Sequence, residues 1–358
     1  MKPEYFEDLI ELCTSISTQE NKLLPLCAAE NVASPFSKIP LDTFLQEKYI
    51  MGGVMQYQNE SNFVGSQKLY EIYELLTRQC HKLYGCKYAD ARTLSGVNAV
   101  MTLLMSLFSA GDTILISSEE CGGHGSMPKI CHRLGINMIE MPYDYDMYDF
   151  NYEEINTILA SQKIDGILIC LSDLIIMPQL QKINLPDECV LIFDATQILG
   201  LIASNNMENP LKWFNDKQKF ILMGATHKTI PGPTCGLIMT NNLEFANEFD
   251  TLINPDYLRN NQLHHIFSLI LTLMELEIYG YQYGSNIIQN ANTLADILEK
   301  YNFTVLKASS EYTYTHQIFI SMPEYDAKKF YDKCLDYGIS INLRNKHLYR
   351  TCGLRIGT

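Results

Sequence analysis

Lys228 stands alone in the stretch MGATHKTIPGPTCGLIM (residues 223–239), where it follows Thr-His at the end of an apolar run and precedes a Pro/Gly loop. No other Asp, Glu, Lys or Arg occurs between Phe220 and Leu243. This isolation is typical of a partly desolvated amine, whose pKa can fall enough for it to act as a nucleophile. On this stretch alone, a lysine that extends from a strand end into solvent is an equally good interpretation.

Two further features could complete a site around such an amine. Asp194 closes the apolar run VLIFD, and Ser95-Gly96 precedes an apolar helical stretch, whose first backbone N–H groups can bind an anion. An amine, a carboxylate and an anion-binding helix start are the parts that pyridoxal phosphate (PLP) needs. The amine forms the covalent link, the carboxylate keeps the pyridine nitrogen protonated, and the helix start holds the phosphate. The order of these residues along the chain allows such a site.

Short apolar runs separated by polar or helical segments predict the strands that must position these groups. The runs are residues 113–117, 137–141, 166–171, 190–194 and 220–224. Their apolar character on both faces indicates buried strands of a mostly parallel sheet. Ser172, Asp194 and Lys228 then lie at or just beyond the carboxyl ends of three strands, where open parallel sheets bind their ligands.

Helical spacing of apolar residues predicts helices over 66–83 and 97–108, and one or two long helices over 263–299. The remainder of the chain indicates a small α+β domain, with a helix near 326–337. The predicted class is therefore α/β, with a mostly parallel sheet between helices. We expect a large domain with an N-terminal segment over 1–260, and a smaller C-terminal domain over 261–358.

Composition excludes several classes of function. The chain has 358 residues and a formal net charge of -14, which argues against nucleic acid or an anionic membrane as the main partner. No apolar stretch reaches the roughly 20 residues that span a bilayer, and the acidic, amphipathic N-terminus does not resemble a signal peptide. The eleven cysteines include no C-x-x-C pair. We therefore expect free thiols in a reducing cytosol, with no disulfide framework and no metal site.

Six stretches, in order along the chain, resemble motifs of the serine hydroxymethyltransferase family, which has the PLP-dependent aspartate-aminotransferase-like fold. They are LCAAENVASP, KLYGCKYADARTLSGVNAV, EECGGHGS, FDATQILGLIA, ATHKTIPGPTCGLIM and CGLRIGT. The resemblance implies a PLP-dependent transferase or aldolase of amino acid metabolism. It also implies a small amino-acid substrate and a cytoplasmic homodimer or tetramer, in which a neighbour's loop near residues 53–63 completes each site.

The resemblance also implies roles for the residues of the cofactor site. Lys228 would link to the cofactor aldehyde, Asp194 would pair with the pyridinium nitrogen, and His124 would stack on the ring. These three are the expected catalytic residues. The remaining cofactor contacts would come from Ser95 and Gly96 at the phosphate, Ser172 near the ring oxygen, and His227 beside the lysine.

On the substrate side, Arg355 would clamp the α-carboxylate, a task that suits a guanidinium fork. Tyr57, the one family tyrosine kept in its segment, would contact the substrate. Glu30, in AAEN, either caps a helix or touches ligand, and the sequence leaves both readings open.

The family's segment with a catalytic glutamate and paired tyrosines departs most from its pattern. Here it reads GVMQYQNESNFVG, and ungapped alignment puts Met55 at the glutamate position. In the family that glutamate handles protons and contacts folate, and a methionine cannot carry a proton. Glu60 could replace it only if the loop is shifted. The sequence therefore predicts weakened or lost dependence on tetrahydrofolate.

Further positions of the cofactor and phosphate sites also differ from the family's residues. Ala29 stands at a family serine, Gln197 at a histidine and Val97 at a serine of the phosphate loop. Asn260-Asn261 stand at a family Gly-Gly pair, which lets the backbone of the partner subunit reach the cofactor phosphate. The sequence ends at Thr358, whereas sequences of the family continue further. Either the small domain is trimmed or the sequence is a truncated form.

Three hypotheses remain at this stage. The first is a hydroxymethyltransferase-type enzyme of altered specificity, acting by aldol or retro-aldol chemistry at the α-carbon of a small amino acid. The second is another PLP reaction on the same scaffold, namely transamination, decarboxylation or substitution in a biosynthetic pathway. The third is a non-catalytic relative that binds PLP, which an intact Lys228 disfavours.

Overall fold

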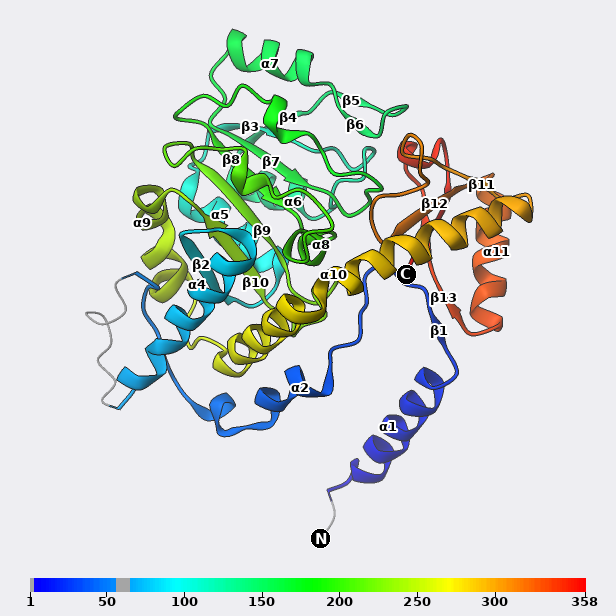
Figure 1. Ribbon diagram of the computed structural model, residues 1–358, viewed down its shortest axis with the longest axis horizontal. Coiled ribbons are helices and arrows are strands. Elements are labelled where there is room, and N and C mark those ends of the chain that lie inside the picture. Colours follow the sequence, from blue (N-terminus) through cyan, green and yellow to red (C-terminus); the bar gives the residue numbers. More distant parts are fainter. Residues whose placement is uncertain (1–2, 56–64) are drawn as a thin grey trace.

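The computed structural model describes residues 3–55 and 65–358 and contains a central seven-stranded sheet (Figure 1). Strand β10 runs antiparallel to both of its neighbours, β2 and β9, and the four remaining pairs of neighbouring strands are parallel. In sheet order they are β2 (Tyr88–Thr93), β10 (Gly236–Thr240), β9 (Phe220–Ala225), β8 (Val190–Asp194), β7 (Gly166–Cys170), β3 (Thr113–Ile116) and β4 (Asn137–Glu140). Every residue of β2, β7, β8, β9 and β10 is buried, as expected for strands covered on both faces.

Helices enclose this sheet. They are α4 (Glu71–Tyr84), α5 (Gly96–Leu107), α6 (Met127–Leu134), α7 (Tyr152–Ser161), α8 (Leu199–Ala203), α9 (Leu243–Thr251) and α10 (Leu263–Lys300). Contacts join α5 to β9 and β10, and α10 to both α4 and α8. The sheet and these helices together form the mostly parallel α/β layer structure that the apolar runs predict.

A second, smaller unit follows at the C-terminal end. Its four-stranded sheet has the order β11 (Thr304–Val305), β12 (Gln317–Ser321), β15 (Gly353–Gly357) and β14 (Asn342–Arg344), and α11 (Glu324–Asp336) packs on it. The 38-residue helix α10 serves both units. Its residues as far as Ile287 belong to the large hydrophobic core, whereas Ala291 and Ala295 belong to the small one. The proposed division at residue 260 stays a prediction.

The N-terminal segment runs beside the smaller unit. Strand β1 (Leu24–Pro25) pairs in parallel with β13 (Ile339–Ser340). Before it, α1 (Phe6–Glu20) extends away from the rest of the chain (Figure 1) and has no buried residue. Its apolar side chains Leu9, Ile10 and Ile16 are exposed. The remaining short elements are α2 (Pro35–Lys38), β5 (Tyr143–Asp144) and β6 (Asp149–Phe150).

The structure confirms all five strands predicted from apolar runs and resolves the long C-terminal helical region into the single helix α10. Strands β2 and β10, which form one side of the sheet, were not predicted from the apolar runs. The eleven cysteines are free thiols, and of these Cys13 is exposed. Among the described residues, no helix combines the length and the apolar character needed to cross a membrane.

Candidate active site

A cavity of about 150 Å³ lies at the carboxyl ends of β7, β8 and β9 and brings most of the predicted cofactor residues together. The lining residues are Ser95, Gly96, Val97, His124, Cys170, Leu171, Ser172, Asp194, Thr196, Gln197, Ala225, His227 and Lys228. All seven residues predicted to hold the cofactor are in this set. Residues separated by up to 133 positions in the chain therefore meet at one edge of the sheet, as parallel-strand topology requires.

Lys228 follows β9, and its amine is largely buried. Burial lowers the pKa of this amine from its usual value, while the carboxylate of Asp194 opposes that shift. The backbone around the lysine is held from another segment, because Asn31 donates its side-chain amide to the Lys228 carbonyl and, at 2.8 Å, to the Tyr283 hydroxyl. The backbone of Lys228 is therefore held in place, and burial of its side chain favours the neutral, nucleophilic form of the amine.

Asp194 is fixed by two hydrogen bonds at the end of β8. Its Oδ1 accepts from the Thr196 backbone N–H at 2.9 Å, and its Oδ2 accepts from the Cys170 thiol at 3.1 Å. Cys170 is the register partner of Asp194 on β7. Burial and the adjacent carboxylate raise the pKa of the Cys170 thiol, which keeps it protonated as a donor. The carboxylate thus has a defined orientation in the cavity.

His124 is placed by the tight turn that precedes it. Gly122 has φ 99°, and a Cβ there would lie 2.4 Å from the Asp173 carbonyl oxygen, so the turn requires glycine. The His124 backbone N–H donates to the Cys170 carbonyl at 2.9 Å, and its Nδ1 accepts from the Ser126 N–H at 3.2 Å. Burial lowers the pKa of His124. A neutral ring with its proton on Nε2 follows from these contacts.

The start of α5 forms another wall of the cavity. Ser95 is the N-cap residue, and its Oγ accepts from the Asn98 N–H at 3.2 Å. A Cβ at Gly96 would lie 2.9 Å from the Ala225 Cβ, so glycine lets the helix start approach the end of β9. First-turn N–H groups and the helix dipole make this end suitable for an anion such as a phosphate. His227 lies nearby, with its Nδ1 buried and without a hydrogen-bond partner.

Arg355, on β15, lies immediately behind the cavity wall and is only 3% exposed. Its Nη1 donates to the Ser172 carbonyl at 2.7 Å and to Asp173 Oδ1 at 3.1 Å. Its Nε and Nη2 both donate to Asn342 Oδ1, at 3.2 and 2.8 Å. The arginine therefore adjoins the cofactor cavity through Ser172, and its guanidinium plane is fixed from both sides.

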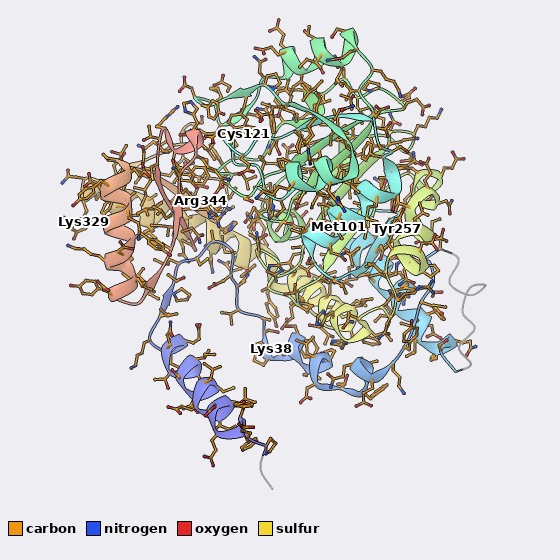
Figure 2. The ribbon with its side chains drawn as sticks, turned by 180° about the vertical axis from the view of Figure 1, so that it is seen from behind. Lys38, Met101, Cys121, Tyr257, Lys329 and Arg344 are labelled. Atoms are coloured by element: carbon orange, nitrogen blue, oxygen red, sulfur yellow. The ribbon has the colours of Figure 1, made fainter. Side chains whose placement is uncertain are left out.

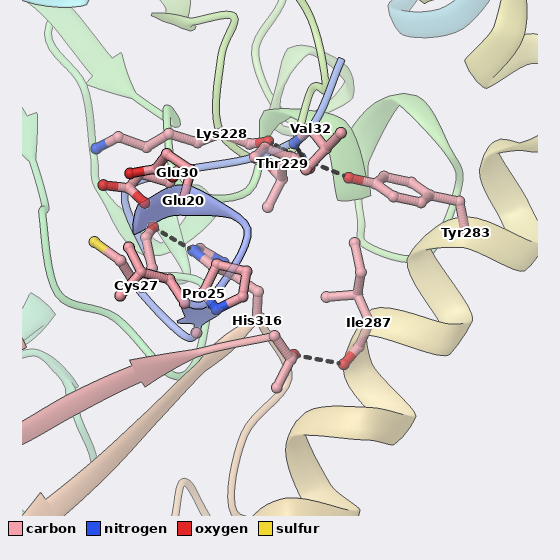
Figure 3. Close-up of a pocket in the computed structure, with 15 residues that line it drawn as sticks. Glu20, Pro25, Cys27, Glu30, Val32, Lys228, Thr229, Tyr283, Ile287 and His316 are labelled. Atoms are coloured by element: carbon pink, nitrogen blue, oxygen red, sulfur yellow. Dashed lines mark hydrogen bonds between the residues drawn. The ribbon is translucent and has the colours of Figure 1, made fainter. Parts of the chain in front are cut away.

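A second cavity, of about 430 Å³, adjoins the first because Lys228 lines both. Glu30 lines this second cavity, and Figure 3 shows its carboxylate and that of Glu20 on the same side of the cavity as Lys228. Tyr57 and Glu60 lie outside the described residues. Met55 is not among the residues that line either cavity, and its backbone N–H donates to Asp250 Oδ2 at 3.1 Å.

Two residues of this site, Gln317 and Asp173, could not be identified from the sequence. Gln317 donates its amide both to Gln197 Oε1 and to the Ser172 carbonyl, each at 3.0 Å, and so ties β12 to the cavity wall. Asp173 accepts hydrogen bonds from Arg355 and from two other cationic side chains. The sequence signal for Asp173 is weak: a single acidic residue two positions beyond the predicted strand 166–171.

The arrangement was compared with known proteins. A model of the serine hydroxymethyltransferase family matches residues 4–358. The chain belongs to this family. The serine hydroxymethyltransferase of Sulfolobus acidocaldarius is 28% identical over 331 residues, which cover 89% of this chain and 73% of that protein. The serine hydroxymethyltransferase of Pyrobaculum arsenaticum is 24% identical over 369 residues, covering 100% and 84% respectively.

Among solved structures, the L-threonine transaldolase of Pseudomonas fluorescens has the same fold, with a TM-score of 0.89 over 98% of this chain and 81% of that one. The sequence identity to that transaldolase is 22%. Membership of the serine hydroxymethyltransferase family identifies the protein as an enzyme of the PLP-dependent transferase class. The expected family and fold are thereby confirmed, whereas the individual residue roles remain predictions.

Proposed function

We propose that this enzyme binds PLP in the cavity at the ends of β7, β8 and β9. The observation that carries the proposal is the meeting of a buried amine, an oriented carboxylate and a helix start in one cavity, at Lys228, Asp194 and Gly96. In this assignment Lys228 links to the cofactor aldehyde, Asp194 faces the pyridine nitrogen, and the first turn of α5 holds the phosphate. Bound PLP supplies an electron sink for a carbanion at the α-carbon of an amino acid.

The chain's own residues would then position the substrate and handle its protons. Arg355 binds the α-carboxylate, which orients the remaining bonds of the α-carbon. Burial lowers the pKa of Lys228, which favours its role in taking up and returning a proton at the α-carbon. His124 covers one side of the site as a neutral ring, held by its bonds to Ser126 and Cys170.

The reaction that we propose is aldol or retro-aldol cleavage, or transfer of a hydroxymethyl-type group, at the α-carbon of a small amino acid. Family membership and the fold shared with an L-threonine transaldolase support this class. Met55 supports weakened or lost use of tetrahydrofolate, because its thioether cannot transfer the proton that the family's glutamate handles. Transamination, decarboxylation and substitution are the alternatives, and analysis of the products separates them.

A homodimer or tetramer is part of this proposal. Helix α1 exposes the apolar side chains of Leu9, Ile10 and Ile16 and has no buried residue. Contact of such an apolar face with water is unfavourable, so the face is suited to packing against a partner. A second copy of the chain is the partner that family membership favours. Sedimentation equilibrium of the full chain measures the oligomeric state.

The test is the visible absorption of the purified protein, before and after glycine, with and without tetrahydrofolate. The yellow band of lysine-bound PLP should be present in the wild type and absent from Lys228→Ala. Lys219→Ala is the matched control, because Lys219 directly precedes β9 at its other end and pairs there with Glu188 and Glu248. Its band should match that of the wild type.

Two outcomes would overturn parts of the proposal. Failure of the wild type to form the band after PLP is supplied would refute cofactor binding. A glycine-dependent band that tetrahydrofolate strongly enhances would show that the enzyme still uses folate, although Met55 replaces the family's glutamate. A glycine response that folate leaves unchanged is the expected result.

A further inference from the structure

Asp173 sits at the centre of a cationic cluster behind the cofactor cavity. Its Oδ1 accepts hydrogen bonds from Arg344 Nε at 2.9 Å, from Arg355 Nη1 at 3.1 Å and from the Tyr349 hydroxyl at 3.1 Å. Its Oδ2 accepts from Lys346 Nζ at 2.8 Å. The Asp173 side chain is 0% exposed, and Arg355, Lys346 and Arg344 are 3%, 16% and 25% exposed. The cations hold the pKa of the Asp173 carboxyl below its usual value against the effect of burial.

The charges of this cluster do not balance. Three cations surround one carboxylate, which leaves a formal surplus of two positive charges. Within residues 3–55 and 65–358, none of the three cations has a second acidic partner at ion-pair distance. The neighbouring Glu120 uses its Oε2 to accept from the His347 backbone N–H. Uncompensated charge at low exposure is costly, and it is stabilised when an anion binds.

The surplus lies behind the cavity wall: none of the three cations is among the residues that line the two cavities, but two of them donate to backbone carbonyls at that wall. Arg355 donates to the carbonyl of Ser172, a residue of the cavity wall. Lys346 Nζ also donates to the Gly123 carbonyl at 3.1 Å, one residue before His124. Arg344 belongs to the smaller C-terminal unit and lies on the side that faces the larger one (Figure 2). The cluster therefore joins the two units at the edge of the cavity.

We propose that Arg344 and Lys346 form a subsite for a second anionic group on the amino-acid substrate. This inference rests on the proposed function, in which Arg355 takes the α-carboxylate. A substrate with two carboxylates would bring the charge of the cluster to zero and one with a phosphate would exceed it, whereas glycine would leave one positive charge uncompensated. The favoured class is therefore amino acids whose side chain carries a carboxylate or a phosphate. Asp173 is the positioning residue that holds the three cations together.

Isosteric pairs of ligands test this proposal on the PLP-loaded enzyme. L-aspartate and L-asparagine differ by one charge at nearly constant shape, and O-phospho-L-serine and L-serine test phosphate in the same way. A charge-assisted hydrogen bond predicts about tenfold or greater preference for the anionic member of a pair. The Kd values come from calorimetric titration, with the visible spectrum recorded in parallel. Preference within either pair supports the subsite, and the responding pair identifies the anion.

Variants locate the effect. Arg344→Gln and Lys346→Gln should reduce the preference for the anionic ligand and change the affinity for its neutral partner much less. Arg344→Lys keeps the charge and should retain most of the preference. Lys307→Gln is the control, since Lys307 pairs with Glu299 on the surface, and it should not alter the preference.

Two results would overturn the subsite. One is a wild-type enzyme that binds both members of each pair equally well. The other is an equal loss of affinity for charged and neutral ligands in Arg344→Gln, which would mean that the cluster only joins the two units. The yellow band reports separately on the proposed function: a variant or wild type without that band fails at cofactor binding, not at this subsite.

Discussion

Asp194→Asn is the substitution that tests the site most directly, because it removes one charge and almost no volume. The asparagine can keep its Oδ1 as acceptor for the Thr196 N–H, which Asp194 now binds at 2.9 Å. Its amide would replace the oxygen that accepts from the Cys170 thiol at 3.1 Å. Since the thiol can act as a weak acceptor, the local fold should survive. The variant therefore isolates the effect of the carboxylate charge on catalysis.

The size of the effect on kcat/KM follows from the hydrogen bond that would be weakened, that between Asp194 and the pyridine nitrogen of bound PLP. A hydrogen bond to a charged group contributes about 1.5–3 kcal/mol. Because about 1.36 kcal/mol corresponds to a tenfold rate change, kcat/KM should fall by about 10- to 150-fold. Asp194 also opposes the lowering of the pKa of Lys228, so that pKa should fall further in the variant.

The assay is retro-aldol cleavage of L-threonine, followed through the acetaldehyde that is released, with the PLP content of each preparation measured. Asp165→Asn is the control, because Asp165 Oδ2 also accepts a backbone N–H, that of Thr113 at 2.9 Å, but outside both cavities. Wild-type kcat/KM in a PLP-loaded Asp194→Asn enzyme would refute the reasoning. So would an equal loss of activity in Asp165→Asn.

Two further predictions concern stability. Asp250→Asn should lower the free energy of unfolding by about 1.5–3 kcal/mol, because it weakens the hydrogen bonds of a buried carboxylate to Arg92 while Asp90 stays as the counter-ion of that arginine. The exposed Asp216→Asn should lower it by less than about 1 kcal/mol, and equal losses in urea titrations would contradict this. Burial lowers the pKa of His316 to about 4, whereas a histidine of the unfolded chain has a pKa of about 6.5. Between these two pH values the unfolded chain binds a proton that the folded state does not. The free energy of unfolding should therefore fall as the pH drops from about 6.5 to 4, by up to about 3 kcal/mol. His316→Gln, whose amide can still donate to the Ala28 carbonyl, should flatten this pH dependence, and an unchanged slope would show that other groups cause it.

The strand pattern of the large unit was predictable because its strands are buried on both faces. Asp194 and Lys228 could be placed at strand ends from their apolar runs alone. The single helix α10 was harder to predict, because Gly280 and Gly284 lower helix propensity. The structure explains both glycines: a Cβ would lie 3.1 Å from Ser204 Cβ at Gly280, and 2.1 Å from Asn206 Oδ1 at Gly284.

The cluster around Asp173 could not be predicted from the sequence. Asp173 and Arg355 are 182 residues apart, and their contact depends on how the smaller unit packs against the larger one. The same is true of Gln317, which reaches Gln197 from another sheet. Local patterns identify groups at the ends of strands, whereas contacts between the units require the complete tertiary structure.

Helix α10 also gives the molecule a mechanical property. Its 38 residues form a rod about 57 Å long, embedded in the large core at one end and in the small core at the other. A small tilt at the Leu263 end becomes a much larger displacement at the Lys300 end. The hydrogen bonds from Arg355 to Ser172 and Asp173 oppose such a displacement, and so they hold Arg355, in the smaller unit, in place relative to Lys228, in the larger one.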